Sequence, residues 1–466
     1  MTQRDSDLQD QDTRWLDLIE ALLTRLRGRM SVIQPAAERH QLAASALQNL
    51  YEQPPSGRFP EFTSDEARQD FLQHFLSYGL IEEFLSDPSI EDIMINATGP
   101  IFVHRTGQGL IKTDTRFTTT RELELFVMKL LVFAGHAELD PINDVELADV
   151  RGRVNIAQSP FGHQITITRG KPQPLTILQL IESGMLTFTL AAQLWLYVEG
   201  LRIRPANLLI SGGPGAGKST LLNALLSFIP WEDRTVIIED TLELNTVFLE
   251  NCSRLESCRR AKTPDLVKNS LRMRPERILV GEVRGVEARD MMTAMSLGKY
   301  CMSTIHASSA REIILRLQNE PMNVPPVLVN LVDVFIILKK LNTEGRVQRV
   351  VSELVESGGM ERQVVLLATV WSYDQAQHQV IEALPSSNYR DHLSKESGWP
   401  APRIIEEAQR RAAILERMQA TEQFTDIAAV TRFCQRYSTQ PEATLRDLEA
   451  MPIAHPLQPE GRRRHR

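Results

Sequence analysis

The chain has 466 residues, of which 42% are hydrophobic and 24% are charged. This ordinary globular composition excludes a collagen-like, rod-like or largely disordered protein, and such a length predicts about three domains. The net charge is -7, and the four cysteines form no C-x-x-C pair. A protein that coats nucleic acid is therefore disfavoured, and neither a zinc finger nor a disulfide framework is expected.

The ends and the apolar runs of the chain bear on its location. Residues 1–12 are acidic and polar, unlike the basic and apolar start of a signal peptide. The longest uncharged run, Ser183 to Val198, contains several polar residues and is shorter than the ~20 residues that span a bilayer. We therefore expect a cytoplasmic protein, for which any membrane role must come through a partner.

Periodicity and turn residues divide the chain into five segments. We expect a helical extension and linker (1–62), an α+β domain (63–170), a hinge (171–186), a domain of alternating strands and helices (187–356) and a C-terminal hairpin with a helical tail (357–466). The first segment holds one apolar helical face, formed by Trp15, Leu18, Ile19, Leu22, Leu23 and Leu26. This face either packs on its own domain or docks a partner.

Two segments have distinct strand patterns. In the second, short apolar runs alternate with turns around a helix expected over residues 122–133, after a helix start at Ser64. In the fourth, continuous apolar runs at 208–210, 236–238, 278–280 and 334–337 alternate with helices. Such runs predict a mainly parallel sheet covered on both faces, and thus an α/β fold. Pro172 and Pro174 mark the hinge, and a hairpin is expected over 364–380. After Pro402 a helix is expected to bury one apolar face, formed by Ile404, Ile405, Ala408, Ala412 and Leu415.

A glycine-rich loop predicts nucleotide binding. The loop satisfies G-x-x-x-x-G-K-[ST] between a strand and a helix, the context that this motif requires. Glycines let backbone N–H groups converge on phosphate, and the helix start adds positive potential. We expect Lys218 to reach the outer phosphates and the Ser219 hydroxyl to ligate Mg²⁺. The candidate binding residues are Gly212, Gly213, Pro214, Gly215, Ala216, Gly217, Lys218, Ser219 and Thr220.

Carboxylates follow two of the buried strands. Glu239, Asp240 and Glu243 come after the strand at 236–238, and Glu282 comes after the strand at 278–280. Carboxylates at the carboxyl edge of such a sheet can hold Mg²⁺ or deprotonate the attacking water. The candidate metal ligands are Ser219, Glu239, Asp240 and Glu282. Acids in this position also commonly cap helices. However, acids after two strands beside a phosphate-binding loop favour a role in the nucleotide site.

Hydrolysis also needs a permanent cation beside the transferring phosphoryl group. The candidates are Arg151, Arg153, Arg169, Arg272, Arg274 and Arg277, although most arginines only solubilise a surface. His306 follows a strand-like run. A lone histidine there is either a structural residue or part of the site.

The ordered set of motifs resembles the secretion ATPase superfamily, which powers type II and type IV secretion, type IV and Tad pili and archaeal flagella. Residues 238–244 resemble its Asp box, 271–285 its arginine stretch and atypical Walker B, and 303–310 its His box. Residues 85–96 and 151–155 resemble its N-terminal domain. The likeness covers about residues 81–355.

Details within the superfamily favour a Tad-type or archaeal-type filament motor. Residues 265–275 and 281–287 are close to the Tad-type pattern, whereas 316–325 and 194–196 look more like archaeal members. The four-cysteine zinc element of type II members is absent from the sequence. Residues 167–170 match the family's Ile-Arg-Lys segment loosely, which leaves the role of Arg169 open.

The resemblance implies an architecture and roles for the candidates. It implies a RecA-like P-loop NTPase domain after a small, PAS-like α+β domain, assembled as a ring homohexamer that binds ATP and Mg²⁺. Glu243 would be the catalytic base, Glu282 the Walker B acid and His306 a phosphate or interface sensor. The arginines that would reach a nucleotide or a neighbouring subunit are Arg151, Arg153, Arg169, Arg272, Arg274 and Arg284.

The implied function is a motor that hydrolyses ATP to ADP and phosphate. It would drive assembly of a filament, its retraction, or both, through a polytopic platform protein of the inner membrane that handles pilin subunits. This partner would associate the motor peripherally with the membrane. A nucleic-acid translocase and a type IV secretion traffic ATPase use the same engine, and the acidic charge balance counts against a nucleic-acid partner. A nucleotide-binding regulator without turnover is a third interpretation.

Overall fold

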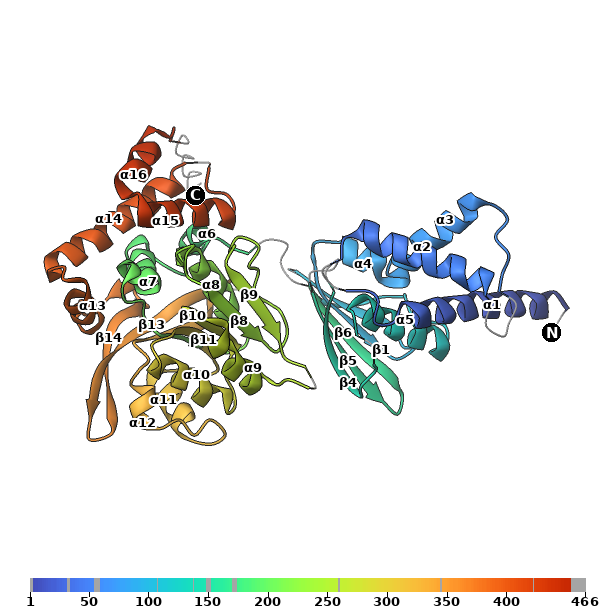
Figure 1. The fold of residues 1–466 in the computed structure, drawn as a ribbon, viewed down its shortest axis with the longest axis horizontal. Helices are drawn as coiled ribbons and strands as arrows, with labels where there is room; N and C mark the ends of the chain where they lie inside the picture. Colours follow the sequence, from blue (N-terminus) through green and yellow to red (C-terminus); the bar gives the residue numbers. More distant parts are fainter. Residues whose placement is uncertain are drawn as a thin grey trace, which may run out of the picture. The chain divides into compact units, whose positions relative to one another are not determined.

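The computed structural model divides the chain into two units, Met1–Pro172 and Gln173–Arg466, each with a sheet of its own (Figure 1). The described residues are 3–31, 34–53, 59–106, 108–136, 138–147, 152–169, 174–258, 260–343, 346–421 and 423–453. The expected boundaries after residues 62 and 356 fall inside these units. Most of the expected linker at 54–60, Pro172 of the hinge and the arginine-rich end of the chain lie outside the described residues.

The first unit is an antiparallel sheet with helices on one face (Figure 1). Its strands run in the order β3-β2-β1-β6-β5-β4. Their bounds are β1 Ile90–Asn96, β2 Ile101–Arg105, β3 Gly109–Lys112, β4 Ile142–Leu147, β5 Gly152–Ser159 and β6 Gly162–Arg169. The helices are α1 Gln3–Leu26, α2 Ala36–Glu52, α3 Asp65–Leu76, η1 Gly79–Ile81, α4 Glu82–Ser86 and α5 Thr120–Phe133. The strands and central helix expected between residues 90 and 168 are confirmed.

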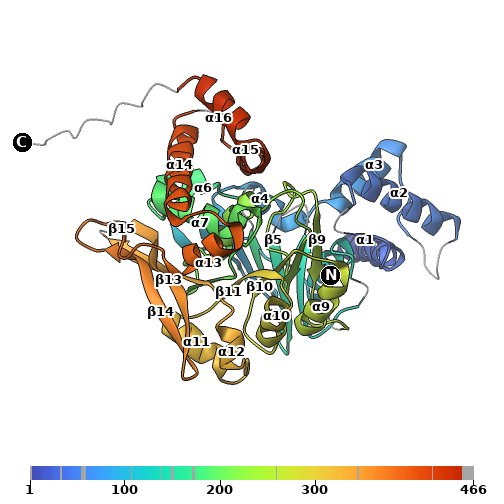
Figure 2. The same cartoon turned by 60° about the vertical axis from the view of Figure 1, so that its left-hand side comes forward.

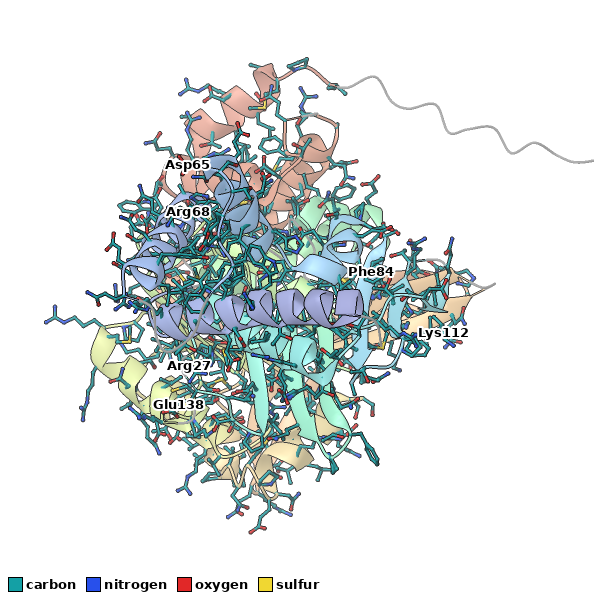
Figure 3. All side chains as sticks on the ribbon, turned by 90° about the vertical axis from the view of Figure 1, so that its right-hand side faces the viewer. Arg27, Asp65, Arg68, Phe84, Lys112 and Glu138 are labelled. Atoms are coloured by element: carbon teal, nitrogen blue, oxygen red, sulfur yellow. The ribbon has the colours of Figure 1, made fainter. Side chains whose placement is uncertain are left out.

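Alternation along the strands builds the core of this unit. Val154 and Ile156 of β5 are fully buried, whereas Arg153 projects from the exposed face, as the two-residue period of a strand requires. Leu18 and Leu22 of α1 are fully buried in the same core. Figure 3 shows α1 crossing in front of these strands. The first of the two interpretations of the N-terminal helix, packing on its own domain, is therefore confirmed.

The second unit is built on a nine-stranded mixed sheet in the order β15-β14-β13-β12-β7-β11-β10-β8-β9. Pairing is parallel from β12 through β9 and antiparallel from β12 to β15. The bounds are β7 Leu208–Gly212, β8 Thr235–Glu239, β9 Cys252–Glu256, β10 Arg277–Glu282, β11 Tyr300–Ile305, β12 Val334–Thr343, β13 Arg346–Glu361, β14 Val364–Asp374 and β15 Gln379–Glu382. The α/β class, the mainly parallel sheet and the hairpin after Val364 are confirmed.

Helices cover both faces of this sheet (Figure 2). One layer holds α6 Ile177–Glu182, α7 Phe188–Glu199, η2 Gly200–Arg202, α8 Lys218–Leu225, η3 Leu226–Phe228 and the C-terminal helices α13 Asn388–Ser397, α14 Ala401–Gln419, α15 Ile427–Thr439 and α16 Pro441–Ala450. The other holds α9 Thr263–Ser270, η4 Leu271–Met273, α10 Glu287–Ser296, α11 Ala310–Gln318 and α12 Pro326–Val329. Leu208 and Ile210 pack against the first of these helix layers, and Leu209 packs against the second. Burial on both faces explains the continuous apolar runs.

The buried face of α14 differs from the expected one. Ile405 is 42% exposed, whereas Arg411 is 2% exposed. The Arg411 guanidinium pairs with Glu199 of α7 and with Glu407, and it lies 4.8 Å from the ring centroid of Trp195. The prediction failed at Ile405 because it counted apolar residues only, whereas this helix buries a paired charge. No helix among the residues in the stated ranges has the length and apolar character needed to cross a membrane.

Candidate active site

The glycine-rich loop joins the central strand β7 to α8, and its backbone explains its glycines. Gly215 and Gly217 have φ of +69° and +99°, a region that non-glycine residues rarely adopt. A Cβ atom on Gly217 would lie 2.9 Å from Cε of Met185. Gly213, Pro214 and Gly215 are exposed. The loop is therefore an open cradle at the start of a helix, which suits a phosphate group.

Lys218 begins α8 and turns back over the loop. Its Nζ donates to the carbonyl oxygens of Gly212 at 3.0 Å and Gly213 at 3.3 Å. Burial lowers the pKa of Lys218, and the nearby carboxylates of Glu282 and Glu243 oppose that shift. The cation thus lies between the loop and two of the predicted catalytic acids, where an outer phosphate would be neutralised.

His306 joins this group instead of packing in the core. Its Nδ1 lies 3.4 Å from Nζ of Lys218, and its Nε2 lies 3.0 Å from Oε1 of Glu282. Strand β11, which precedes His306, lies between β7 and β10, so the parallel strands deliver all three side chains to one edge. Of the two interpretations of His306, the structure favours membership of the site.

Glu243, which follows β8 on the same side of β7, also lies close to the loop. The Ser219 hydroxyl donates to Oε2 of Glu243 at 3.2 Å. Glu239 fixes the backbone that carries Glu243, because its Oε1 accepts the N–H groups of Glu243 at 2.9 Å and Leu244 at 3.0 Å. Burial raises the pKa of Glu239, against the lowering effects of Arg254 and of these N–H groups.

Two of the expected metal ligands have other partners. Glu239 is 3% exposed, and its second carboxylate oxygen pairs with Arg254 at 3.3 Å. Asp240 accepts from the Ser257 hydroxyl at 2.9 Å and pairs with Arg284. Both carboxylates are therefore committed to holding the loop after β8. Of the predicted metal ligands, Ser219 and Glu282 contact residues at the cradle, as does the predicted base Glu243.

A comparison with known proteins identifies the family. A sequence profile described as "Type II/IV secretion system protein" matches residues 144–446. The chain belongs to the type II/IV secretion ATPase family. The resemblance seen in its motifs is thereby confirmed.

The proteins similar to this chain differ in sequence identity and in how much of each chain the match covers. An uncharacterised protein of Methanocaldococcus jannaschii, MJ0900, is 31% identical over 77% of this chain and 68% of its own length. A second protein of that organism, MJ0781, is 37% identical, but the match spans 32% of its length. The conjugal transfer protein TrbB of Rhizobium radiobacter is 30% identical over 50% of this chain and 73% of its own. The crystal structure of the pilus retraction motor PilT with ADP is 16% identical, with a TM-score of 0.45 over 73% of this chain and 91% of PilT.

The predicted arginines of the second unit are exposed or paired with carboxylates. Arg272 and Arg274 are exposed residues just before β10, at the opposite end of that strand from Glu282. The expectation that they line the site is wrong for the chain's own loop, so only a role toward another subunit stays a prediction. Arg277 is buried and pairs with Asp233 at 2.7 Å. Arg284 is exposed and bound to Asp240.

The candidates in the first unit separate into two kinds. Arg153 is exposed on β5, with Asp144 3.3 Å away. Arg169 instead donates to the backbone carbonyls of Asp87 and Ile90, so it fixes the entry into β1. Arg151 lies outside the described residues. Of the two described candidates, Arg153 is the exposed one, and its role toward nucleotide stays a prediction.

One residue at the cradle carries no signature in the sequence. Nε of Arg349, on β13, donates to the carbonyl oxygen of Gly215 at 2.9 Å. No motif marks this position, and the motif-based prediction missed it. The available signal was its place in a basic hairpin with Lys339, Lys340 and Arg346, directly after the strand that pairs with β7.

The residues at the cradle fit a nucleotide with Mg²⁺. Among residues that the structure describes, no group of three His, Cys, Asp or Glu side chains could hold a metal by itself. Mg²⁺ is typically bound by one or two protein oxygens, by phosphate oxygens and by water. Ser219, with Glu243 and Glu282 nearby, supplies such a partial set beside the open loop.

Proposed function

We propose that this secretion ATPase hydrolyses ATP at the loop of residues 212–219 and uses the energy to drive a filament. The observation that carries the proposal is the convergence of five side chains from four separate segments on that loop. They are Lys218, Ser219, Glu243, Glu282 and His306.

Each side chain has a distinct task in this proposal. Lys218 leaves the carbonyls of Gly212 and Gly213 and neutralises the outer phosphates, and binding an anion there favours its charged form. Glu243 accepts a proton from the attacking water, since its carboxylate lies at the mouth of the cradle. His306 connects the cation and Glu282, so it senses whether the terminal phosphate is present. Bound Mg²⁺ would add charge neutralisation at the phosphate oxygens, with Ser219 and Glu282 as its protein partners.

The assembly and its partners are also proposals. We infer a homohexamer in which Arg153 of one subunit completes the site of another, because charge on the transferring phosphoryl group needs a further cation. Loss of the terminal phosphate removes that charge and weakens the closed state. The cytoplasmic ring would act on a membrane platform protein that handles pilin subunits, in a Tad-type or archaeal-type system.

Phosphate release by the purified chain tests the proposed activity. Wild-type protein with ATP and Mg²⁺ should release phosphate continuously, and Lys218→Ala should abolish release. Lys395→Ala is a matched control, because Lys395 is an exposed lysine on α13, and it should match wild type. A wild-type oligomer that binds ATP without releasing phosphate would establish the regulator instead.

A second candidate is a nucleic-acid translocase or a traffic ATPase that handles DNA in type IV secretion, because the similar protein TrbB is named for conjugal transfer. The two candidates differ in what stimulates turnover. A filament motor should respond to a platform protein in lipid, whereas a DNA translocase should respond to DNA. Stimulation by DNA alone would favour the second candidate.

A further inference from the structure

The hairpin of β12 and β13 extends past the strand that carries the phosphate loop. Strand β12 pairs with β7 from Val334 to Leu338, and Leu338 lies opposite Gly212, the last residue of β7. Its pairing with β13 continues to Thr343, opposite Arg346. The end of the hairpin therefore runs beside the loop, beyond the edge of the parallel sheet.

Arg349 reaches from this hairpin to the loop. Its Nε donates to the Gly215 carbonyl oxygen at 2.9 Å, and its Cδ would lie 3.5 Å from a Cβ atom on Gly217. A guanidinium carries five N–H donors, and this bond uses one. Within the described part of the chain no carboxylate forms an ion pair with Arg349. Its charge is thus available to an anion in the cradle.

The strand order decides which part of a nucleotide Arg349 meets. Glu243, Glu282 and His306 follow β8, β10 and β11, which all lie on one side of β7, whereas β12 and β13 lie on the other. A terminal phosphate that faces the first group directs the inner phosphates and the ribose toward the second. Met185, whose Cε lies against Gly217 and whose carbonyl accepts the Val351 N–H at 3.2 Å, belongs to the same flank.

We propose that Arg349 binds the inner phosphates of ATP and ADP within its own subunit. This inference rests on the proposed ATPase activity. With the cradle empty the guanidinium rests on the Gly215 carbonyl, and a bound nucleotide offers phosphate oxygens, for which its charge and planar shape are better suited. Arg349 therefore governs affinity and leaves the hydrolysis step to the acids on the other flank.

Three substitutions of Arg349 test whether its side chain binds phosphate or only stabilises the loop. Fluorescently labelled ADP and ATP serve as probes for the dissociation constants, and Arg362→Ala, at the exposed turn between β13 and β14, is the control. Arg349→Ala should raise both dissociation constants about tenfold, which corresponds to about 1.4 kcal/mol. Arg349→Lys should retain most of the affinity because it keeps the charge. Arg349→Gln, which keeps a donor for the Gly215 carbonyl but no charge, should bind as weakly as Arg349→Ala.

Single-turnover hydrolysis at saturating ATP completes the test. The rate constant of Arg349→Ala should equal that of wild type, so the defect appears in KM and not in kcat. Wild-type affinity in Arg349→Gln together with weak binding in Arg349→Lys would overturn the proposal in favour of a structural brace. Unchanged ADP affinity in Arg349→Ala would also overturn it. A wild-type protein that binds ADP but does not hydrolyse ATP would refute the proposed function, and the ADP measurements would still judge Arg349.

Discussion

The Nε2 atom of His306 lies 3.0 Å from Oε1 of Glu282, while the opposite ring nitrogen faces Lys218. The imidazole thus connects the cation of the cradle to an acid that follows a neighbouring strand. In the proposed mechanism, His306 would couple the presence or absence of the terminal phosphate at Lys218 to Glu282. This role can be tested by substitution of His306.

Removal of the His306 ring should slow hydrolysis more than it weakens binding. His306→Ala loses contacts to charged groups, so kcat should fall about tenfold while the ATP dissociation constant stays close to wild type. Steady-state phosphate release and nucleotide titration measure the two quantities. Because His306 and Glu282 act as a pair, adding Glu282→Gln should cost less than the two single effects combined. Full additivity would show that the contact has no role.

Glu243→Gln should separate binding from chemistry. The amide keeps the shape of the side chain but cannot accept a proton from water, so hydrolysis should fall about 100-fold or more. ATP should still bind, because the glycine loop and Lys218 are intact. The structure supplies a contrasting variant in Glu239→Gln, which should lower protein stability because Glu239 is buried and holds the Glu243 loop. Unchanged turnover in Glu243→Gln would remove Glu243 from the role of base.

Substitution of the two candidate arginines Arg153 and Arg169 in the first unit should have different effects. Arg153→Ala removes an exposed cation and should impair hydrolysis without changing the melting temperature. Mixed oligomers with Lys218→Ala should regain some activity if one subunit's arginine serves another's nucleotide. Arg169→Ala should instead lower the melting temperature, because its guanidinium fixes the carbonyls before β1. Absence of recovery in the mixture would contradict a shared site.

A buried lysine gives the first unit a pH-dependent stability. Burial lowers the pKa of Lys129 from 10.5 to about 8, so between these values the unfolded chain binds more protons than the folded one. Stability therefore rises with pH in this window. At pH 7 Lys129→Met should be more stable than wild type by about 3 kcal/mol, and most of the difference should vanish by about pH 10. Denaturant unfolding at both pH values measures it, and a difference independent of pH would refute this assignment.

Patterns within contiguous segments of the sequence predicted much of the fold and the residues that lie around the glycine loop. The spacing of the glycine loop, the apolar strands and the acids after them are properties of contiguous segments. Parallel strands bring their carboxyl ends together, so the residue pattern alone could group Glu243, Glu282 and His306 with Lys218.

The remaining features depend on contacts between distant segments. Arg349 reaches Gly215 across two strand pairings, and Arg411 is buried only because Glu199 meets it from α7. Glu239 and Glu243 are both carboxylates after one strand, and sequence cannot tell which one turns inward to cap the backbone. Each of these outcomes depends on tertiary geometry, which a pattern of residue types does not encode.

Binding of ATP in the glycine cradle is tested most directly by a cryo-EM structure of Glu243→Gln with ATP and Mg²⁺. The proposed mechanism predicts the triphosphate along residues 212–219, with its terminal phosphate beside Lys218, Glu282 and the mutated position. A triphosphate held elsewhere, or a terminal phosphate turned away from Glu282 and position 243, would contradict it.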